Sequence, residues 1–176
     1  LAVFDEVNAI AGAKIHIKVE TGMGRNGFAN EWPELLKRDL SKVVGVMTHF
    51  ARADEPSEEQ NKLQLKNFSD RIAELNAAGV NPIRHISNTA ATLSNKDARM
   101  DMVRVGIAMY GLSPDVTTLG PADNYQLKPA MTLKAKLALV KFAPEGSAVG
   151  YGGTVVLKRA THLGLVVMGY SDGIPR

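Results

Sequence analysis

The sequence predicts an α/β fold in which a part with alternating strands and helices is followed by a part built from strands alone. Up to about residue 112, short apolar stretches alternate with helical patterns, which is typical of a parallel sheet with right-handed crossovers. Such a sheet belongs either to a layered fold or to part of a barrel. Ser113–Asn124 is then rich in Pro, Gly and Asp, and the strand patterns after it have no helix between them. We therefore expect the boundary between the two parts near residues 113–127.

The first four elements follow from periodicity and end signals. Apolar residues recur at helical spacing over Ala2–Ala11, and a glycine suited to end the helix comes next. Polar and apolar residues alternate over Lys14–Val19, as they do in a strand. Glu31–Leu40 has the pattern of a short amphipathic helix, with Asn30 as its expected N-cap. Val43–Phe50 is almost continuously apolar, which is typical of a strand covered on both faces.

The later elements are predicted in the same way. Ser57 and Gln60 form a capping-box pattern, which opens a long helix that we expect to run to about Ala78. Asn88 is the expected N-cap of a shorter helix that begins at Thr89. The remaining expected strands are Ile83–Ile86, Met102–Val105, Ala130–Phe142 and Thr161–Tyr170, the last two separated by the turn-rich Gly146–Gly153.

Composition and charge exclude several classes of function. The chain has 176 residues, of which 45% are hydrophobic, so it can bury a sizeable core. Its formal charge of +3 is spread without runs of like charge, which argues against a nucleic-acid or membrane surface. The absence of cysteine excludes disulfides, thiol nucleophiles and zinc–thiolate sites, and agrees with a cytoplasmic location.

The two ends and the hydropathy of the chain lead to three further expectations. No apolar stretch is long enough to cross a bilayer. Leu1–Gly12 contains acidic residues and no basic segment, so it does not fit a signal peptide. The chain starts without methionine and stops one residue after a proline, so we expect both ends to be cut from a longer protein.

A loop with three glycines follows the first strand. The glycines at 22, 24 and 27 match the spacing of the dinucleotide-binding fingerprint, but no helix pattern follows at once, so the match is weak. The loop is either an ordinary tight turn or a turn that lets Arg25 reach a carboxylate with its bidentate guanidinium. Lys18 and Arg25 would lie close together if the loop turns back. They would then need a compensating anion, either Glu20 or a modification of Lys18.

Three further segments place reactive side chains at strand or helix ends. His49 ends an apolar strand, where it serves either as a structural group or in proton transfer. Thr89 lies at an expected helix start, which is suited either to ordinary capping or to a phosphate group. Arg104 leads into Gly106 and Ile107, a second turn that either contacts the same phosphate or ends a strand with a solvated arginine.

Tyr170 lies at the end of the last strand, in the run Gly169–Arg176. A tyrosine has an ordinary pKa of about 10, so it needs a neighbouring cation or hydrogen-bond network before it can remove an α-proton. The alternative is that Tyr170 has a structural role at the end of the strand. The four histidines have no metal-ligand spacing, so no metal site is predicted, and the sequence lacks the Gly-x-Ser-x-Gly turn of the hydrolases.

Six segments occur in the order found in alanine racemases, a family of pyridoxal-phosphate enzymes, and the chain is similar to that family over nearly its whole length. The segments are Lys18–Arg25, Thr48–Ala51, Asn88–Ala90, Arg104–Leu112, Val149–Gly152 and Gly169–Arg176. The resemblance implies a partial (β/α)8 TIM-type barrel followed by the start of a C-terminal β domain. Residues 1–120 correspond to the later portion of the barrel and residues 121–176 to the first strands of the β domain.

The resemblance also implies an activity. The intact enzyme is expected to be a homodimer that interconverts L-alanine and D-alanine through an aldimine of pyridoxal 5′-phosphate. Two bases then act on opposite faces of the α-carbon, and the product D-alanine serves peptidoglycan synthesis. Tyr170 matches the base for the L-isomer, which is contributed across the subunit interface and hydrogen-bonded to His49.

The other matching positions have roles implied by the same resemblance. Arg104 matches an arginine that faces the pyridine nitrogen and lies next to His49. Arg25 matches one near the substrate carboxylate. Lys18 matches a lysine that is carbamylated in several relatives. The matching phosphate-binding positions are Thr89, which replaces the serine of many relatives, Gly106 and Ile107.

One departure affects the expected activity. The lysine that forms the Schiff base in this family lies in an upstream segment that this chain does not contain, so we expect the chain alone to be inactive. A second active-site tyrosine of the family is expected downstream of the last residue. Two alternatives remain open, a broad-specificity amino-acid racemase or decarboxylase, and a pyridoxal-phosphate-binding barrel protein without racemase activity.

Overall fold

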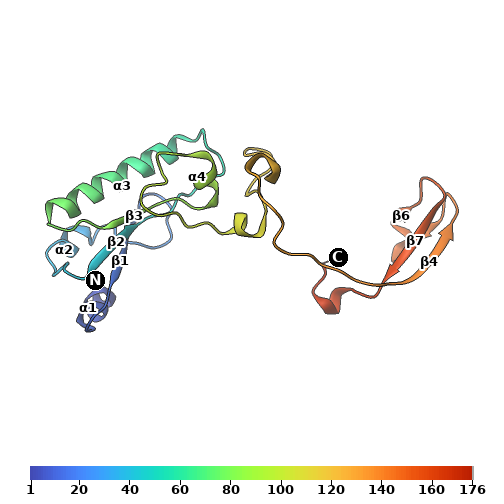
Figure 1. The fold of residues 1–176 in the computed structure, drawn as a ribbon, viewed down its shortest axis with the longest axis horizontal. Coiled ribbons are helices and arrows are strands. Elements are labelled where there is room, and N and C mark those ends of the chain that lie inside the picture. Colours follow the sequence, from blue (N-terminus) through green and yellow to red (C-terminus); the bar gives the residue numbers. More distant parts are fainter. Residues whose placement is uncertain (176) are drawn as a thin grey trace. The chain divides into compact units, whose positions relative to one another are not determined.

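The computed structural model describes residues 1–175, and Arg176, the last residue of the C-terminal run, lies outside the described residues. The chain divides into two compact units, one up to Ala130 and one from Met131 onward (Figure 1). Each unit is described by itself. The division of the intact protein into a barrel portion up to residue 120 and a β domain from residue 121 stays a prediction.

A parallel three-stranded sheet forms the centre of the first unit. Its strands are β1 (Ile15–Lys18), β2 (Val43–Met47) and β3 (Ile83–His85), in the spatial order β1-β2-β3 (Figure 1). The predicted parallel sheet is therefore confirmed for these strands. His16 pairs with Gly45, and Met47 pairs with His85, so both residues of each pair lie at the same level along the sheet.

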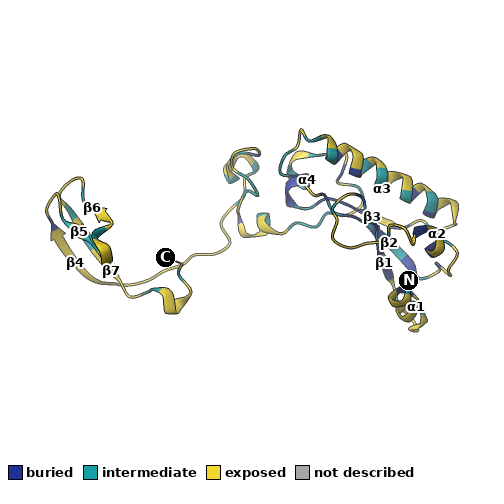
Figure 2. Cartoon of the chain, turned by 180° about the vertical axis from the view of Figure 1, so that it is seen from behind, coloured by how far each residue is buried: buried dark blue, intermediate teal, exposed yellow. Residues whose placement is uncertain are grey.

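Four helices accompany this sheet: α1 (Ala2–Ala9), α2 (Trp32–Leu35), α3 (Glu59–Ala77) and α4 (Thr89–Ser94). The long helix α3 connects β2 to β3, as a crossover between parallel strands requires. Its buried residues Phe68, Ile72 and Leu75 recur at helical spacing and belong to the same core as Ile17 and Val46 of the sheet. Figure 2 shows this burial concentrated on the strands and on the sides of the helices that face them.

The end of α3 follows the sequence prediction closely. Gly79 adopts a φ of +84°, a conformation that a residue with a Cβ rarely takes. Its N–H donates to the carbonyl of Asn76 (3.0 Å), and the N–H of Val80 donates to the carbonyl of Leu75 (2.9 Å). These two bonds are those of a Schellman motif, so the glycine ends the helix by satisfying its last carbonyl groups.

Two predicted helix starts are wrong. The N-cap of α2 is Glu31, not Asn30, and α2 itself is shorter than the predicted helix. The N-cap of α3 is Glu58, and no side chain caps it. Gln60 does not complete a capping box, because its side-chain amide donates instead to the carbonyl of Gly22 (2.9 Å), in the loop after β1. A tertiary partner has therefore replaced the local one.

The expected strand over Met102–Val105 is also wrong. Two main-chain bonds tie this part of the chain to β3 and the residues after it, from Asp101 to Arg84 (3.2 Å) and from Arg104 to Ser87 (2.9 Å). The described backbone between them is irregular, so the segment runs beside the sheet without extending it.

The second unit is built from two antiparallel ribbons. One pairs β4 (Leu137–Ala143) with β7 (Thr161–Val166), and these strands were predicted, although they are shorter than expected. The other pairs the two-residue strands β5 (Ala148–Val149) and β6 (Val155–Val156), which were not predicted. Ala143 is buried, whereas most apolar side chains of the ribbons are exposed (Figure 2).

Two kinds of feature are absent from the described residues. Within residues 1–175, no helix is both long and apolar enough to cross a membrane. In the same residues, no group of three or more histidine, cysteine or acidic side chains is placed to hold a metal ion.

Candidate active site

Arg104 is the centre of a polar cluster at the carboxyl ends of β2 and β3. One terminal guanidinium nitrogen, Nη2, donates to the carbonyl of Thr48 (2.6 Å) and contacts Nδ1 of His49 (3.2 Å). The other, Nη1, contacts Nδ1 of His85 (2.7 Å) and donates to the carbonyl of the same residue (3.0 Å). Arg104 therefore joins the ends of two neighbouring parallel strands, and the predicted proximity of Arg104 and His49 is confirmed.

His85 is a site residue whose role the sequence did not reveal. It is 3% exposed and lies at the end of β3. Burial lowers its pKa to about 4, with the positive charge of Arg104 and the neighbouring His16 as further causes. His85 is therefore neutral at neutral pH. Its position at a strand end was the only sign in the sequence that His85 could belong to a site. Its contact with Arg104 depends on the tertiary fold.

The main chain around His49 is fixed by a buried glutamine from α3. The side-chain amide of Gln64 donates to the carbonyl of His49 (3.0 Å), and its oxygen accepts from the N–H of Ala51 (2.9 Å). Thr48 donates its hydroxyl to the carbonyl of Val19 (2.8 Å), which ties the end of β2 to the end of β1. These bonds set the direction in which the His49 ring leaves the strand.

The His49 ring is held in its neutral form. Burial lowers its pKa, and the positive charges of Arg104, Arg25 and Lys18 lower it further. A guanidinium can only donate, so Nδ1 of His49 accepts from Arg104. The proton of the neutral ring must then be on Nε2, which is left as a hydrogen-bond donor.

The three-glycine loop folds back on the end of β1. Phe28 donates its N–H to the carbonyl of Lys18 (2.8 Å), and Glu20 donates its N–H to the carbonyl of Phe28 (3.0 Å). The Glu20 carboxylate accepts from the N–H groups of Gly22 (2.5 Å) and Met23 (2.6 Å), so it holds the loop together. Burial alone would raise the pKa of Glu20, but these and neighbouring N–H groups outweigh it and lower the pKa.

Lys18 and Arg25 lie near one another, as expected if the loop turns back. Burial lowers the pKa of Lys18, and the charge of Arg25 lowers it further, while Glu20 offsets part of the effect. Lys18 donates to the side-chain oxygen of Asn26. Glu20 therefore compensates the two cations only in part, because its effect on the pKa of Lys18 is smaller than those of burial and of Arg25.

The two turns predicted to bind a phosphate come together. The hydroxyl oxygen of Thr89 accepts from the N–H of Gly106 (2.8 Å), and Ile107 begins the 3-10 helix Ile107–Tyr110. Asn88 caps α4 through a bond from the N–H of Ala91 (3.0 Å), as predicted. A Cβ built on Gly106 would meet nothing closer than the Thr89 oxygen, at 4.0 Å, outside its own chain neighbours, so the side of Gly106 on which a Cβ would lie is open.

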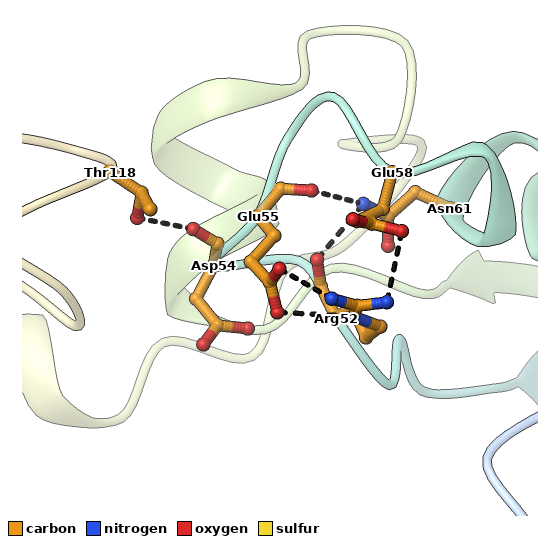
Figure 3. Close-up of polar contacts among 6 residues, drawn as sticks. All are labelled: Arg52, Asp54, Glu55, Glu58, Asn61 and Thr118. Carbon is orange, nitrogen blue, oxygen red and sulfur yellow. Dashed lines mark hydrogen bonds and ion pairs between the residues drawn. The ribbon is translucent and has the colours of Figure 1, made fainter.

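The segment after His49 is fixed by its own polar contacts (Figure 3). The buried side chain of Asn61 donates to the carbonyls of Arg52 and Glu55, both at 2.9 Å. The Arg52 guanidinium contacts the carboxylates of Glu55 (2.5 and 3.0 Å) and Glu58 (2.9 Å). Thr118 donates to the carbonyl of Asp54, which attaches the later connection to this segment.

Tyr170 lies in the second unit, on the 3-10 turn Tyr170–Asp172, and is 71% exposed. Its predicted contact with His49 stays a prediction. Tyr151 lies in one of the six matching segments, but sequence reasoning missed it as a candidate base. Tyr151 is 89% exposed and follows Gly150, whose φ of +73° and ψ of −170° are accessible essentially only to glycine. The signal that could have identified it is the run of glycines on both sides.

The described geometry defines a class of protein. Two imidazoles at the carboxyl ends of neighbouring parallel strands contact one guanidinium. Two turns of the same unit are joined by the bond between Gly106 and Thr89. The chain thus belongs among the α/β proteins whose ligand site is built from the loops after parallel strands.

Comparisons with known proteins identify the family. The alanine racemase N-terminal domain matches residues 2–114, and the alanine racemase C-terminal domain matches residues 130–176. The chain belongs to the alanine racemase family. Its fold is accordingly part of the family's barrel followed by the start of the C-terminal domain, as the sequence predicted.

Several relatives resemble the chain over nearly all its length. It is 40% identical to the alanine racemase of Salinispora tropica, over 97% of this chain and 48% of the relative. It is 44% identical to that of Streptomyces coelicolor, over 93% of this chain and 44% of the relative. The crystal structure of alanine racemase from D-cycloserine-producing Streptomyces lavendulae matches with a TM-score of 0.85 and 45% identity, over 99% of this chain and 49% of that one. The chain therefore spans about half the length of the relatives it matches.

Proposed function

We propose that the intact protein carrying this chain interconverts L-alanine and D-alanine with pyridoxal 5′-phosphate as cofactor. The observation that carries the proposal is the contact of Arg104 with both His49 and His85 at the strand ends of an alanine racemase family member. The product D-alanine would supply peptidoglycan synthesis in the cytoplasm. The second base, a lysine in this family, belongs to a segment that this chain does not contain.

The residues present fit the cofactor. Thr89, Gly106 and Ile107 are the proposed phosphate ligands, because a bond from the Gly106 N–H to the Thr89 hydroxyl (2.8 Å) brings the two turns together and leaves the hydroxyl its own proton to donate. The first N–H groups of a helix have no partner within it, and they favour an anion. Pyridoxal phosphate, when bound, supplies an electron-poor ring that makes the α-hydrogen of an amino acid joined to it acidic.

Arg104 would face the ring nitrogen of the cofactor. Its two terminal nitrogens are engaged by Thr48, His49 and His85, while no acceptor among the described residues contacts Nε. Burial lowers the pKa of Arg104, but a guanidinium still keeps its proton at neutral pH. Arg104 would therefore not give the ring nitrogen a proton, and this would favour return of a proton to the α-carbon over transamination.

His49 would stabilise the charged form of a tyrosine base. Its Nε2–H is free to donate because Nδ1 accepts from Arg104. A hydrogen bond from Nε2–H to a phenolic oxygen favours the phenolate, and the nearby charges of Arg104 and Arg25 act in the same direction. The pKa of such a tyrosine is then lowered toward the working pH, as a general base requires.

The base is proposed to come from the second unit of another copy of the chain, so that the active site is shared across a homodimer. Tyr170 is the residue that the resemblance matches to the base for the L-isomer. Tyr151 is a rival, since it is more exposed and its neighbour Gly150 has a constrained backbone of the kind that clusters at active sites. Both phenols are exposed enough to meet a partner.

Arg25 and Lys18 would serve the substrate end of the site. Arg25 is exposed on the glycine loop, where its guanidinium can bind the carboxylate of alanine. Lys18 has a lowered pKa, so a larger share of it is the neutral amine that reacts with carbon dioxide. Carbamylation would turn Lys18 into an anion and relieve the repulsion from Arg25.

The test uses the intact protein with pyridoxal phosphate and L-alanine, followed by chiral chromatography. D-alanine should form at an enzymatic rate. Replacing the tyrosine base by phenylalanine should lower L-to-D turnover by about 100-fold or more, and replacing the other tyrosine should cost far less. The variants Tyr170→Phe and Tyr151→Phe thus decide between the two residues. Failure to form D-alanine, with the absorbance of bound cofactor present, would show that the protein binds the cofactor for another purpose.

A further inference from the structure

His16 on β1 is connected to Arg104 by a chain of two hydrogen bonds. Nδ1 of His16 lies 2.8 Å from Nε2 of His85, and Nδ1 of His85 lies 2.7 Å from Nη1 of Arg104. The His16 and His85 rings are 5.0 Å apart between centroids. His16 therefore does not contact Arg104 directly, but it is linked to Arg104 through His85.

The direction of both hydrogen bonds is fixed by chemistry. Arg104 has only donors, so Nδ1 of His85 must be without a proton. Neutral His85 then carries its proton on Nε2 and donates it to Nδ1 of His16. Nδ1 of His16 must therefore also be without a proton. A single arrangement of hydrogens satisfies all three side chains.

Gly45 makes this chain of contacts possible. His16 is on β1 and His85 is on β3, and β2 lies between these strands. Gly45 is the residue of β2 that pairs with His16. A Cβ on Gly45 would lie 2.4 Å from Nδ1 of His16 and 2.5 Å from its Cε1, much closer than atoms can approach. The imidazole of His16 crosses β2 only because Gly45 has no side chain, which accords with the close approaches that glycine marks in strands.

We propose that His16 and Gly45 are positioning residues for Arg104, acting through His85. His16 supplies the acceptor for the Nε2–H of His85, while Arg104 donates to Nδ1 on the other side of the ring. Without that acceptor, the Nε2–H has no partner among these side chains, and the His85 ring is held from one side only. The ring can then turn away from Nη1, so Arg104 would lose one of the contacts that hold it. The role of Arg104 toward the cofactor rests on the proposed function, but the arrangement of the three side chains does not.

Three variants of the intact protein test the proposal. His16→Leu keeps much of the volume and removes the acceptor. His16→Asn is the matched control, because its side-chain oxygen can occupy the place of Nδ1. Gly45→Ala changes none of the three polar residues, but its Cβ displaces the His16 ring.

The first readout is the nitrogen-15 NMR spectrum of the histidine rings in the protein without cofactor. We expect the Nε2–H of His85 to give a hydrogen-bonded, slowly exchanging signal in the unmodified protein and in His16→Asn. In His16→Leu and Gly45→Ala, the proton of that N–H should shift upfield and exchange faster, because it has lost its acceptor. The proposal is overturned if both of these variants keep the signal of the unmodified protein while remaining folded.

The second readout separates positioning from a general loss of structure. In His16→Leu, kcat for L-alanine should fall by about tenfold or more, since small misplacements of a catalytic group are costly, while KM changes little. His16→Asn should restore most of kcat. An equal loss of kcat in His16→Leu and His16→Asn would contradict the proposal. If the unmodified protein forms no D-alanine, the proposed function fails, whereas the NMR measurement on His85 still decides whether His16 and Gly45 hold the ring that contacts Arg104.

Discussion

Gly27 packs against the main chain of Val19 so closely that a Cβ on the glycine would lie 2.8 Å from the Val19 carbonyl carbon. The same Cβ would lie 2.7 Å from the nitrogen of Glu20. The φ of Gly27 is +124°, which L-residues with side chains rarely adopt. This contact closes the loop that carries Arg25 onto the end of β1, so the position of Arg25 depends on a glycine at residue 27.

We predict that Gly27→Ala strongly destabilises the loop and the unit. The substitution combines backbone strain of about 1–2 kcal/mol with a steric clash of about 1–3 kcal/mol. Gly24→Ala is the matched control, because Gly24 also has a positive φ (+68°) but a Cβ there meets nothing within 4 Å. Urea unfolding of the cofactor-free intact protein should show a clearly larger loss in the free energy of unfolding for Gly27→Ala than for Gly24→Ala. Equal losses in the two variants would show that the clash is relieved by a small shift of the loop.

The buried histidine predicts a pH dependence of stability. The pKa of His85 is lowered from 6.5 to about 4 in the folded protein, so between these values the unfolded chain binds more protons than the folded one. The free energy of unfolding should therefore decrease as the pH falls from about 6.5 to about 4. The lowered pKa of His49 contributes in the same direction.

The measurement is the free energy of unfolding at a series of pH values, for the unmodified protein and for His85→Asn. The variant should lose part of the slope between pH 6.5 and 4, whatever its stability at neutral pH. Comparing slopes removes the constant effect of altered packing. An unchanged slope would mean that His85 is not held neutral in the folded protein.

Asn61 should matter more for stability than the charged residues around it. Its amide donates to the carbonyls of both Arg52 and Glu55 from a buried position. Asn61→Leu should cost about 1–3 kcal/mol, because both carbonyls lose their donor. The Arg52 side chain is 43% exposed in its ion pairs with Glu55 and Glu58, so Arg52→Gln should cost less than about 1 kcal/mol. Urea midpoints of the two variants compare them directly, and the reverse order would refute the prediction.

The sequence predicted those parts of the fold that depend on local patterns. The strands β1–β3 and the helix α3 follow from periodicity, and the glycine end of α3 follows from a residue that is suited to positive φ. The capping box at Ser57 and Gln60 failed because Gln60 found a partner in Gly22, which lies 38 residues away in the sequence. β5 and β6 have two residues each, too few for any period to be recognised.

The same distinction applies to the site. His49, Arg104, Thr89 and Gly106 lie in segments with recognisable end signals, and the contacts of His49 with Arg104 and of Thr89 with Gly106 agree with the predictions. The part played by His85 and His16 could not be predicted, because it depends on which strands are neighbours and on their register. Only the pairing of His16 with Gly45 shows that an imidazole can cross β2.

The second unit should not fold as an isolated segment. Side chains alternate between the two faces of a strand, so Leu139 lies on one face of β4 and Val140 and Phe142 lie on the other. These side chains are 51%, 55% and 62% exposed, so both faces of the ribbon need a covering that the ribbon does not provide. Two-stranded ribbons are marginally stable in water even when one face is polar.

We therefore expect residues 131–176, produced alone, to give either the narrow amide NMR dispersion of an unfolded chain or concentration-dependent association in sedimentation. In the intact protein, the same apolar residues should be protected by other parts of the molecule. Replacing Phe142 with threonine separates the two outcomes, because it reduces association without supplying a core. A monodisperse segment with a cooperative thermal transition would show instead that the ribbons are stable without the rest of the protein.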